Sequence, residues 1–387
     1  MAWLVSLFGG LAFFLFVHFP GYIEDLGGSE IEIGLIVAST ALAAIVVRPK
    51  IGKEMDRRGR RPMILAGGAV NIIVLLLYLT IQSLGPWVYV VRVIHGFAEA
   101  MLFASIFTYA ADILPDNNRT HGLALFGISG MLPIALGGLL GDFILARWDF
   151  QALFMTSVGL AIVAFTLSLF LPEVVEPAGK EGGTSFLAPL RQRDLLPIWW
   201  MTVVFSLALA AYFTFLRTFI DENGIGTVGG FFAAYSATAI FLRLTTGWLP
   251  DRVGPKKVLY PALVLFAGGF AVLSGAGSNG AVLLAGALCG AGHGYSFPIL
   301  YALAFGRAEM KNRGSASAIF TGLFDVGALV GGPAFGLLIA SFSYQTMFLV
   351  AAAWVLTGGI VFAAWDGDLW RKGTGVESLA GPSPPNI

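Results

Sequence analysis

Three ionisable side chains interrupt one long apolar stretch of the sequence. Arg92, His95 and Glu99 lie within Val88–Leu114, at spacings of three and four residues that place them along one face of a helix. Burial disfavours a charged carboxylate, whereas a nearby arginine favours it. A conformational change that alters either influence would load and release a proton, and a histidine between the two groups could carry it. The trio predicts either such a proton relay or an Arg–Glu brace between helices.

Two more ionisable residues occupy apolar stretches in the second half of the chain. His293 lies 194 residues after Glu99, and Asp325 follows in a later stretch rich in glycine. A single histidine in an apolar helix is more often a hydrogen-bonded core residue than a proton carrier, so both interpretations stay open for His293. A carboxylate in such surroundings is costly, and we expect Asp325 to act in proton coupling or solute binding. The expected site residues are Glu99, Asp325, Arg92, His95 and His293.

The composition indicates which elements carry these residues. Of the 387 residues, 57% are hydrophobic and 12% are charged, and the mean hydropathy is +0.81, whereas soluble domains contain about 25% charged residues. Apolar stretches of about 17–25 residues, the length that crosses a bilayer as a helix, occur twelve times. Their continuous apolar character favours helices over a barrel. The sequence therefore predicts an all-α membrane protein with 12 transmembrane helices. The predicted spans are Ala2–Tyr22, Ile31–Ile51, Met63–Ser83, Val88–Leu114, His121–Ala146, Leu153–Leu171, Ile198–Ile220, Val228–Leu249, Val258–Ser274, Ala281–Phe305, Ser315–Ala340 and Met347–Trp365.

The same composition argues against several classes of function. The 23 Lys and Arg balance the 23 Asp and Glu, so the chain lacks the basic surplus that binds nucleic acid. No phosphate-binding motif of the form G-x-x-x-x-G-K-[ST] occurs, which argues against ATP hydrolysis. Neither a metal-ligand cluster nor a nucleophile–base pair occurs at a helix-face spacing. We therefore expect no enzyme activity, no metal and no cofactor.

Basic residues are concentrated in alternate loops, which predicts the orientation. Lys and Arg favour the cytoplasmic side, and the loops after the even-numbered spans contain most of them. Both termini are therefore expected in the cytoplasm, in a multi-pass protein of the plasma (inner) membrane. The first span lacks the basic start and the cleavage site of a secretory signal, so we retain it as a span.

A polar segment separates two groups of six spans. Residues 172–197 contain Pro, Gly and several charges, which is typical of a flexible linker. The predicted domains are an N-terminal six-helix bundle at 1–171, a cytoplasmic linker at 172–197, a C-terminal six-helix bundle at 198–365 and a disordered cytoplasmic tail at 366–387.

The two halves repeat one motif. Arg48-x3-Gly52-x3-Asp56-Arg57-x-Gly59-Arg60-Arg61 returns 195 residues later as Arg243-x3-Gly247-x3-Asp251-Arg252-x-Gly254-Pro255-Lys256-Lys257. The pair Gly137-Gly138 returns 194 residues later as Gly331-Gly332. Because an even number of spans separates the matching features, the halves are parallel copies, and we expect two pseudo-symmetric bundles.

The repeated motif has two interpretations. Its basic residues either fix the topology alone or form, with Asp56 and its counterpart Asp251, a charged clasp that gates one face. An acid at a fixed spacing in both copies favours the clasp, since topology needs only Lys and Arg. Asp112, and Arg119 after it, could pair with the loop charges of the first copy when the cytoplasmic side is shut. We expect Arg48 and Arg243 to reach the membrane–water interface and support the clasp. The predicted gating residues are Gly52, Asp56, Arg57, Gly59, Arg60, Arg61, Gly247, Asp251, Arg252 and Gly254.

The first copy resembles the loop signature of the major facilitator superfamily. In addition, Arg92-x3-Gly96-x-Ala98 resembles part of the span 4 motif of that superfamily, whose arginine is associated with proton transfer. The resemblance covers essentially the whole chain. It implies two six-helix bundles that rock about a site near the middle of the membrane.

Small residues and prolines recur in the fifth and eleventh spans. Such residues permit close helix crossing, and the stretch in the fifth span is similar to the antiporter motif of the superfamily, although Leu132 stands where that motif has glycine. Helix packing alone is the alternative. The residues concerned are Gly130, Pro133, Gly137, Gly138, Gly331, Gly332 and Pro333.

Together these features predict a proton-coupled secondary active transporter that exports a small apolar or amphipathic solute by alternating access. Asn71 and Gln82 are the only amides within the predicted spans, which argues against a sugar. The expected partners are a small-molecule solute, protons and the lipid bilayer, with no nucleic acid, and we expect a monomer. A proton symporter that imports an organic acid or metabolite remains an alternative. So does a non-transporting membrane receptor built on a transporter scaffold.

Overall fold

The protein is helical throughout the part of the chain that the structure describes, residues 1–113, 119–173 and 187–367 of a computed structural model. This confirms the predicted all-α class. The first half contains α1 (Ala2–Phe14), the 3-10 turn η1 (Leu15–His18), α2 (Phe19–Asp25), α3 (Glu30–Arg58), α4 (Arg60–Tyr78), α5 (Pro86–Ile113), α6 (Arg119–Leu145) and α7 (Phe150–Ser168). The second half contains α8 (Ala188–Arg191), η3 (Arg193–Leu195), α9 (Leu196–Asn223), α10 (Val228–Thr246), α11 (Leu249–Val253), α12 (Pro255–Ser274), α13 (Asn279–Arg307), η4 (Met310–Asn312), α14 (Arg313–Ser341) and α15 (Tyr344–Trp365).

Twelve helical segments in the described residues are long and apolar enough to cross a membrane, which confirms the predicted number of spans. The first of them, Ala2–Asp25, joins α1, η1 and α2, and the seventh, Arg193–Asn223, joins η3 and α9. The predicted division of the chain at 172–197 and 366–387 stays a prediction. Of those two segments the structure describes only residues 172–173, 187–197 and 366–367.

The third span differs from its predicted bounds. Helix α4 ends at Tyr78, whereas hydropathy continued the span to Ser83. The apolar residues after Tyr78 form an irregular turn in which Ile81 is buried and its carbonyl accepts a hydrogen bond from the Tyr22 hydroxyl. Hydropathy reports that a segment is buried, but it does not distinguish a helix from a turn whose backbone polar groups are hydrogen-bonded to other residues. The end of α4 was therefore predicted wrongly.

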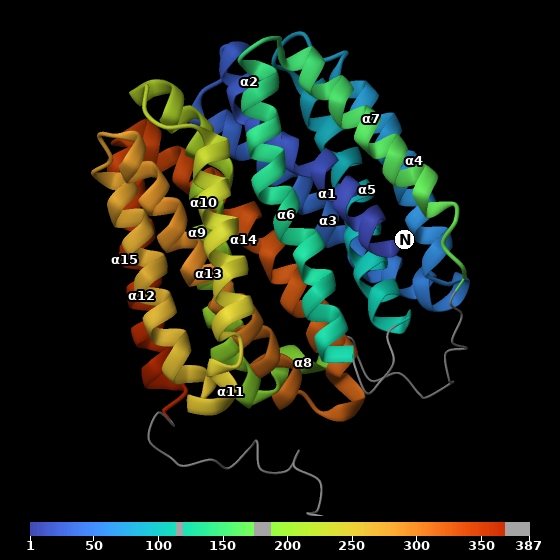
Figure 1. Ribbon diagram of the computed structural model, residues 1–387, viewed down its shortest axis with the longest axis vertical. Helices are drawn as coiled ribbons and strands as arrows, with labels where there is room; N and C mark the ends of the chain where they lie inside the picture. Colours follow the sequence, from blue (N-terminus) through green and yellow to red (C-terminus); the bar gives the residue numbers. More distant parts are fainter. Residues whose placement is uncertain (114–118, 174–186, 368–387) are drawn as a thin grey trace, which may run out of the picture.

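The two halves of the chain form two groups of helices that lie side by side. Figure 1 shows the first half, in blue to green, beside the second half, in yellow to red. Across the boundary, α3 packs against α14, and α6 packs against α10. One end of the molecule carries the repeated motif with α11, and we call it the motif end. The other, with loops 26–29, 146–149 and 224–227, is called the opposite end.

Two glycine pairs bring the halves into backbone contact near the opposite end. A Cβ on Gly332 of α14 would lie 2.8 Å from the carbonyl oxygen of Gly34 in α3, and a Cβ on Gly138 of α6 would lie 3.0 Å from the Cα of Gly229 in α10. Gly34 and Gly229 are 195 residues apart, and Gly138 and Gly332 are 194 apart. The sequence repeat therefore appears in the structure as two equivalent cross-half contacts. Only glycine permits backbones to approach this closely.

Most of the other small residues and prolines of the fifth and eleventh spans also mark close contacts. Gly137 and Gly331 pack within their own halves, against the first helix of each. The contacts are those of Gly137 with Phe14, Gly331 with Ala210, Pro133 with Gly10 and Pro333 with Gly34. Gly130 differs, because a Cβ there would meet nothing within 4 Å.

The repeated motif forms a helix end in each half, but the two copies differ in one detail. Gly59 separates α3 from α4 with φ +90°, and Gly254 separates α11 from α12 with φ +104°. These left-handed conformations need glycine. In the first copy α3 continues unbroken to Arg58, whereas in the second α10 ends at Thr246 and a separate helix, α11, follows. Pro250, which lacks an N–H to continue the helix, accounts for the break.

A bulky side chain at the contact of α3 with α14 should open the opposite end. We expect Gly332→Leu to populate a state in which the halves are further apart there, because the new side chain would collide with the Gly34 backbone. Spin labels at Trp148→Cys and Gly277→Cys, two exposed positions at the opposite end in different halves, should report a longer mean separation by pulsed electron spin resonance.

These measurements use a Cys289→Ala background, since Cys289 is the only native cysteine. Gly159→Leu is the matched control, because a Cβ at Gly159 meets nothing within 4 Å. An unchanged distance distribution in Gly332→Leu would show that the glycine contact does not determine closure of the opposite end.

Candidate functional site

An ion pair joins the two halves along the contact of α3 with α14. The Arg48 Nε donates to Asp325 Oδ2 at 2.5 Å, and the two side chains are 17% and 14% exposed. We expected Arg48 to reach the membrane–water interface and support the clasp, and this expectation was wrong. Because each charge is largely removed from water, either one left alone would be costly.

Glu99 of α5 lies close enough to this ion pair to interact with it electrostatically. The charges of Asp325, Arg92 and Arg48 all act on its carboxylate. In the described part of the chain, that carboxylate has no hydrogen-bond or ion-pair partner. The structure thus brings together Glu99 and Asp325, two carboxyl groups that the sequence placed in different halves. We call Arg48, Arg92, Glu99 and Asp325 the interface charge cluster.

Arg92 and His95 both contact the hydroxyl of Tyr78. The Arg92 Nη1 donates to it at 3.2 Å, and His95 Nδ1 lies 2.8 Å from it. Both side chains are buried, and the Phe16 ring packs edge-on against the imidazole at 5.2 Å between centroids. The structure therefore links Arg92 to His95 through Tyr78 and does not connect His95 to Glu99. The signal for Tyr78 in the sequence, a single tyrosine near the end of an apolar stretch, was too weak to single out.

His293 lies in a similar aromatic environment in the second half. Its Nδ1 hydrogen-bonds the Tyr235 hydroxyl, which also accepts a hydrogen bond from Tyr212 at 3.3 Å. The Phe205 ring packs edge-on at 5.2 Å. This is the environment of a hydrogen-bonded core histidine, one of the two interpretations left open by the sequence. Although His293 is 194 residues from Glu99, its surroundings correspond to those of His95.

Two polar contacts hold the halves together at the opposite end, and the sequence analysis missed both. Asp142 Oδ2 of α6 accepts a hydrogen bond from the backbone N–H of Gly229 at 2.7 Å, in the first turn of α10. This places a carboxylate at the positive end of that helix. Tyr344 at the start of α15 donates to Glu30 Oε1 at the start of α3, at 3.2 Å. For the Asp142 contact, the sequence offered one signal, an acid four residues after the Gly137-Gly138 pair.

In the first copy of the motif, the contacts described for the basic residues after Arg48 lie within the first half. Arg60 pairs with Asp112 of α5 at 2.8 Å. This is the pairing of Asp112 with the loop charges that the sequence suggested. Arg61 donates to the carbonyl oxygen of Leu169, after the end of α7, at 2.9 Å. Arg57 and Arg58 lie near Glu54 of their own helix. The Asp56 side chain lies outside the described residues.

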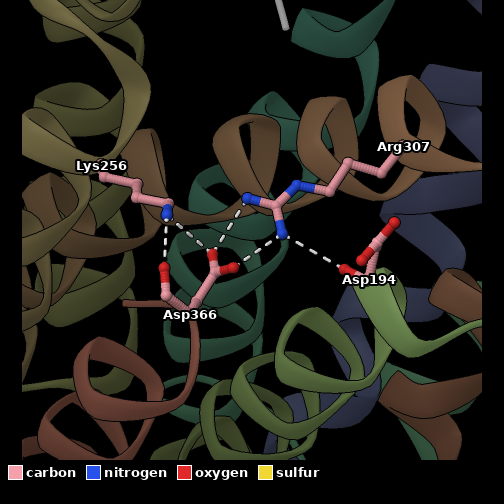
Figure 2. Close-up of polar contacts among 4 residues, drawn as sticks. All are labelled: Asp194, Lys256, Arg307 and Asp366. Atoms are coloured by element: carbon pink, nitrogen blue, oxygen red, sulfur yellow. Dashed lines mark hydrogen bonds and ion pairs between the residues drawn. The ribbon is translucent and has the colours of Figure 1, made fainter. Parts of the chain in front are cut away.

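The second copy of the motif binds the end of the last helix. Lys256 Nζ lies 2.9 Å from Asp366 Oδ2 and also donates to the Asp366 carbonyl oxygen. Arg307, at the end of α13, approaches the same carboxylate with two nitrogens (Figure 2), each at 2.9 Å, and donates to the carbonyl oxygen of Asp194 at 3.2 Å. Arg61 and Lys256 are 195 residues apart. Each therefore contacts the end of the sixth span of its own half, which is α7 for Arg61 and α15 for Lys256.

These contacts change the acidity of Asp366, the first residue of the predicted tail. Burial raises the pKa of its carboxyl group, but hydrogen bonds from Arg307 and Lys256 outweigh burial and hold the pKa below its usual range. Asp251 of the second copy is exposed, and Arg252 lies over the Trp248 ring at 5.4 Å. Thus Arg60 and Arg61 in the first copy and Lys256 in the second brace their own halves at the motif end.

The arrangement is suited to moving charge between two halves of a membrane protein. Among the described residues, no group of three or more His, Cys, Asp or Glu could hold a metal ion. Instead, one ion pair and one neighbouring carboxyl group lie between two repeated helix bundles. Such a twelve-span, two-bundle protein with ionisable groups inside the membrane belongs to the class of secondary transporters.

Comparison with known proteins identifies the family. The sequence matches the family described as Major Facilitator Superfamily over residues 1–233 and 222–373, and the chain belongs to that family of transporters. Multidrug resistance protein MdtG of Citrobacter koseri is 26% identical over 378 residues, which cover 93% of this chain and 92% of the relative. Uncharacterized MFS-type transporter STM4428 of Salmonella typhimurium is 25% identical over 353 residues, covering 89% and 90%. The crystal structure of nucleoside transporter NupG shares the fold, with a TM-score of 0.73 at 16% identity, covering 94% and 98% of the two chains.

Loss of the Asp366 carboxylate should destabilise the second half in a pH-dependent way. We expect Asp366→Asn to lower the free energy of unfolding by about 1–3 kcal/mol at neutral pH, because two charged donors lose their acceptor. Since the folded-state pKa is depressed, the contribution of the carboxylate is complete above its ordinary pKa of about 4. It is lost as the pH falls through the lower folded value.

Thermal unfolding of the purified protein in detergent measures this effect. The difference in Tm between the wild type and Asp366→Asn should be constant from neutral pH to about pH 5 and shrink toward pH 3. Asp149→Asn serves as the control, because Asp149 caps α7 and asparagine also caps helices well. A Tm difference that persists undiminished at pH 3 would contradict a role for the carboxylate charge.

Proposed function

We propose that this chain is a proton-coupled transporter that exports small apolar or amphipathic solutes by alternating access. The observation that carries the proposal is the Arg48–Asp325 ion pair between the halves, close to the Glu99 carboxylate, which has no partner in the described part of the chain. The name of the MdtG relative, a multidrug resistance protein, supports export. The apolar character of the spans supports a solute with few polar groups.

The ion pair couples protonation to the contact between the halves. While Asp325 is ionised, its attraction to Arg48 holds α14 against α3. When Asp325 binds a proton, that attraction is lost, and the two helices can separate at lower cost. A proton thus favours one arrangement of the halves over the other, which is the requirement for coupling.

Glu99 provides a second position for the proton beside the ion pair. Its carboxylate lies among one negative and two positive charges, so its charge state depends on whether Arg48 is engaged with Asp325. Separation of the halves frees Arg48 to attract Glu99. As the halves rock, Arg48 therefore pairs with one carboxyl group and then with the other, and the proton binds the carboxyl group that Arg48 has left. The two groups titrate as a coupled pair.

The contacts at the opposite end complete the transport cycle in this proposal. The Gly34–Gly332 and Gly138–Gly229 contacts, together with the Asp142 bond to α10, hold that end together. At the motif end, the ion pairs of Arg60 with Asp112 and of Lys256 with Asp366 each lie within a single half. We therefore propose that solute enters from the motif end, the cytoplasmic side in the predicted orientation, and leaves when the opposite end opens.

Replacement of Asp325 by asparagine should uncouple transport from protons. Asparagine cannot release a proton or pair with Arg48 as a charge, so we expect Asp325→Asn to reduce gradient-driven movement of solute by about tenfold or more. Exchange of solute between two sides at equal concentration should remain, because it needs no net proton transfer. Proteoliposomes with an imposed pH gradient, tested with ethidium, N-phenylnaphthylamine and anilinonaphthalenesulfonate, provide the measurement.

Asp149→Asn, which changes a carboxylate outside the cluster, is the matched control for flux. Solute that moves opposite to the proton flux supports export by exchange, and solute that moves with the protons would overturn it in favour of symport. Gradient-driven transport at the wild-type rate in both Asp325→Asn and Glu99→Gln would remove the cluster from the coupling mechanism.

A further inference from the structure

Arg243 of α10 is a cation between the halves without an acidic partner among the described residues. Its Nε donates to the carbonyl oxygen of Gly294 in α13 at 3.3 Å. Its Nη1 lies 3.9 Å from the position of a Cβ on Gly127 of α6, so the guanidinium reaches the other half of the molecule. The side chain is only partly exposed. A positive charge in this position needs compensation by an anion.

The repeat shows what is missing beside Arg243. Its counterpart in the first half, 195 residues earlier, is Arg48. The Arg48 Cδ lies 3.8 Å from the position of a Cβ on Gly322 of α14, so Arg48 borders Gly322 through its aliphatic stem, whereas Arg243 borders Gly127 of α6 through its guanidinium. Gly127 and Gly322 are themselves 195 residues apart. The two arginines therefore occupy equivalent positions at the two equivalent contacts between the halves.

Only one of the two positions contains a carboxylate. Arg48 pairs with Asp325, whereas the residues 195 and 194 positions before Asp325 are Gly130 and Met131. Neither can carry a negative charge. A Cβ on Gly130 would meet nothing within 4 Å, so the space that corresponds to the aspartate is open. The arginine and its glycine neighbour thus occur in both halves, whereas the partner carboxylate occurs only beside Arg48.

We propose that the anionic group of a solute binds Arg243 in the place that Asp325 occupies beside Arg48. The solute class is an amphipathic organic anion, a carboxylate, sulfonate or phosphate monoester on an apolar body. Guanidinium groups bind such oxyanions through two parallel N–H donors, and Nη1 and Nη2 are available for this geometry once Nε is engaged with Gly294. The proposal deepens the proposed function, on which it rests for the claim that the bound anion is then transported.

The test compares two probes that differ in charge on the same apolar body. Naphthalenesulfonate and naphthylmethylammonium are titrated into the wild type in lipid nanodiscs by calorimetry. We expect the sulfonate to bind and the ammonium to bind at least about tenfold more weakly, the usual effect of a charged hydrogen bond. Equal affinity for the two probes would overturn the proposal.

Three variants locate the binding site. Arg243→Gln removes the cation and should weaken sulfonate binding about tenfold or more. Gly127→Asp places a carboxylate where, among the described residues, a Cβ has only the Arg243 Nη1 within 4 Å, and should occupy the arginine internally with a similar loss. Gly127→Asn is the matched neutral control and should bind the sulfonate like the wild type. Arg191→Gln, an exposed arginine of α8, controls for loss of a positive charge elsewhere.

If Arg243→Gln fails to fold, Gly127→Asp compared with Gly127→Asn decides the question, since neither removes a side chain from the core. Sulfonate binding to Gly127→Asp that equals binding to Gly127→Asn would overturn the proposal. Flux of the same probes in proteoliposomes separates it from the proposed function. Arg243-dependent binding without gradient-driven flux would refute transport alone, whereas flux of ethidium without sulfonate binding would refute the anion site alone.

Discussion

A charge within a membrane must be matched by another charge, and this constraint explains the most informative features of the protein. Arg48 is matched by Asp325 of the other half, and in the mechanism we propose this match links protonation to the relative position of the halves. Had both residues come from one half, protonation would change local stability but not the contact between bundles. In that mechanism, the location of the ion pair across the boundary, and not its strength, is what allows protonation to change the contact between the bundles.

The repeat divides the structure into what occurs twice and what occurs once. Packing features and basic residues occur twice: the glycine contacts between halves, the positive-φ glycines at Gly59 and Gly254, and the basic residue that contacts the end of the sixth span. The acids within the spans occur once, because Asp325 and Glu99 lack acidic counterparts in the other half. This division is expected physically. Packing must support both bundles, whereas in the proposed mechanism a proton needs to act at one contact only.

Much of the fold was predictable from the sequence, because hydropathy and the repeat act over long segments. Twelve spans emerged directly, and the repeat offset anticipated equivalence of Gly138 and Gly332. Local helix ends were less predictable, as α4 shows, since an apolar turn has the hydropathy of a helix. At the site, Glu99 and Asp325 were found because carboxylates are rare in apolar stretches. Arg48 was misjudged because its proximity to the span end suggested snorkelling, and no property of a single helix reveals a partner 277 residues away.

The two ends of the molecule are held by contacts of different kinds, and this difference bears on how alternating access is driven. At the opposite end the halves contact through glycine backbones, with Asp142 bound to a helix N-terminus and Tyr344 bound to Glu30. Opening that end gives up these hydrogen bonds, of which those to charged groups contribute about 1.5–3 kcal/mol each. The loss is comparable to what protonation of a partly buried ion pair can supply, since each unit of pKa difference between two states corresponds to about 1.4 kcal/mol. A single proton bound at the interface charge cluster is therefore of the right magnitude to shift the balance, provided that water replaces part of the lost hydrogen bonding at the open end.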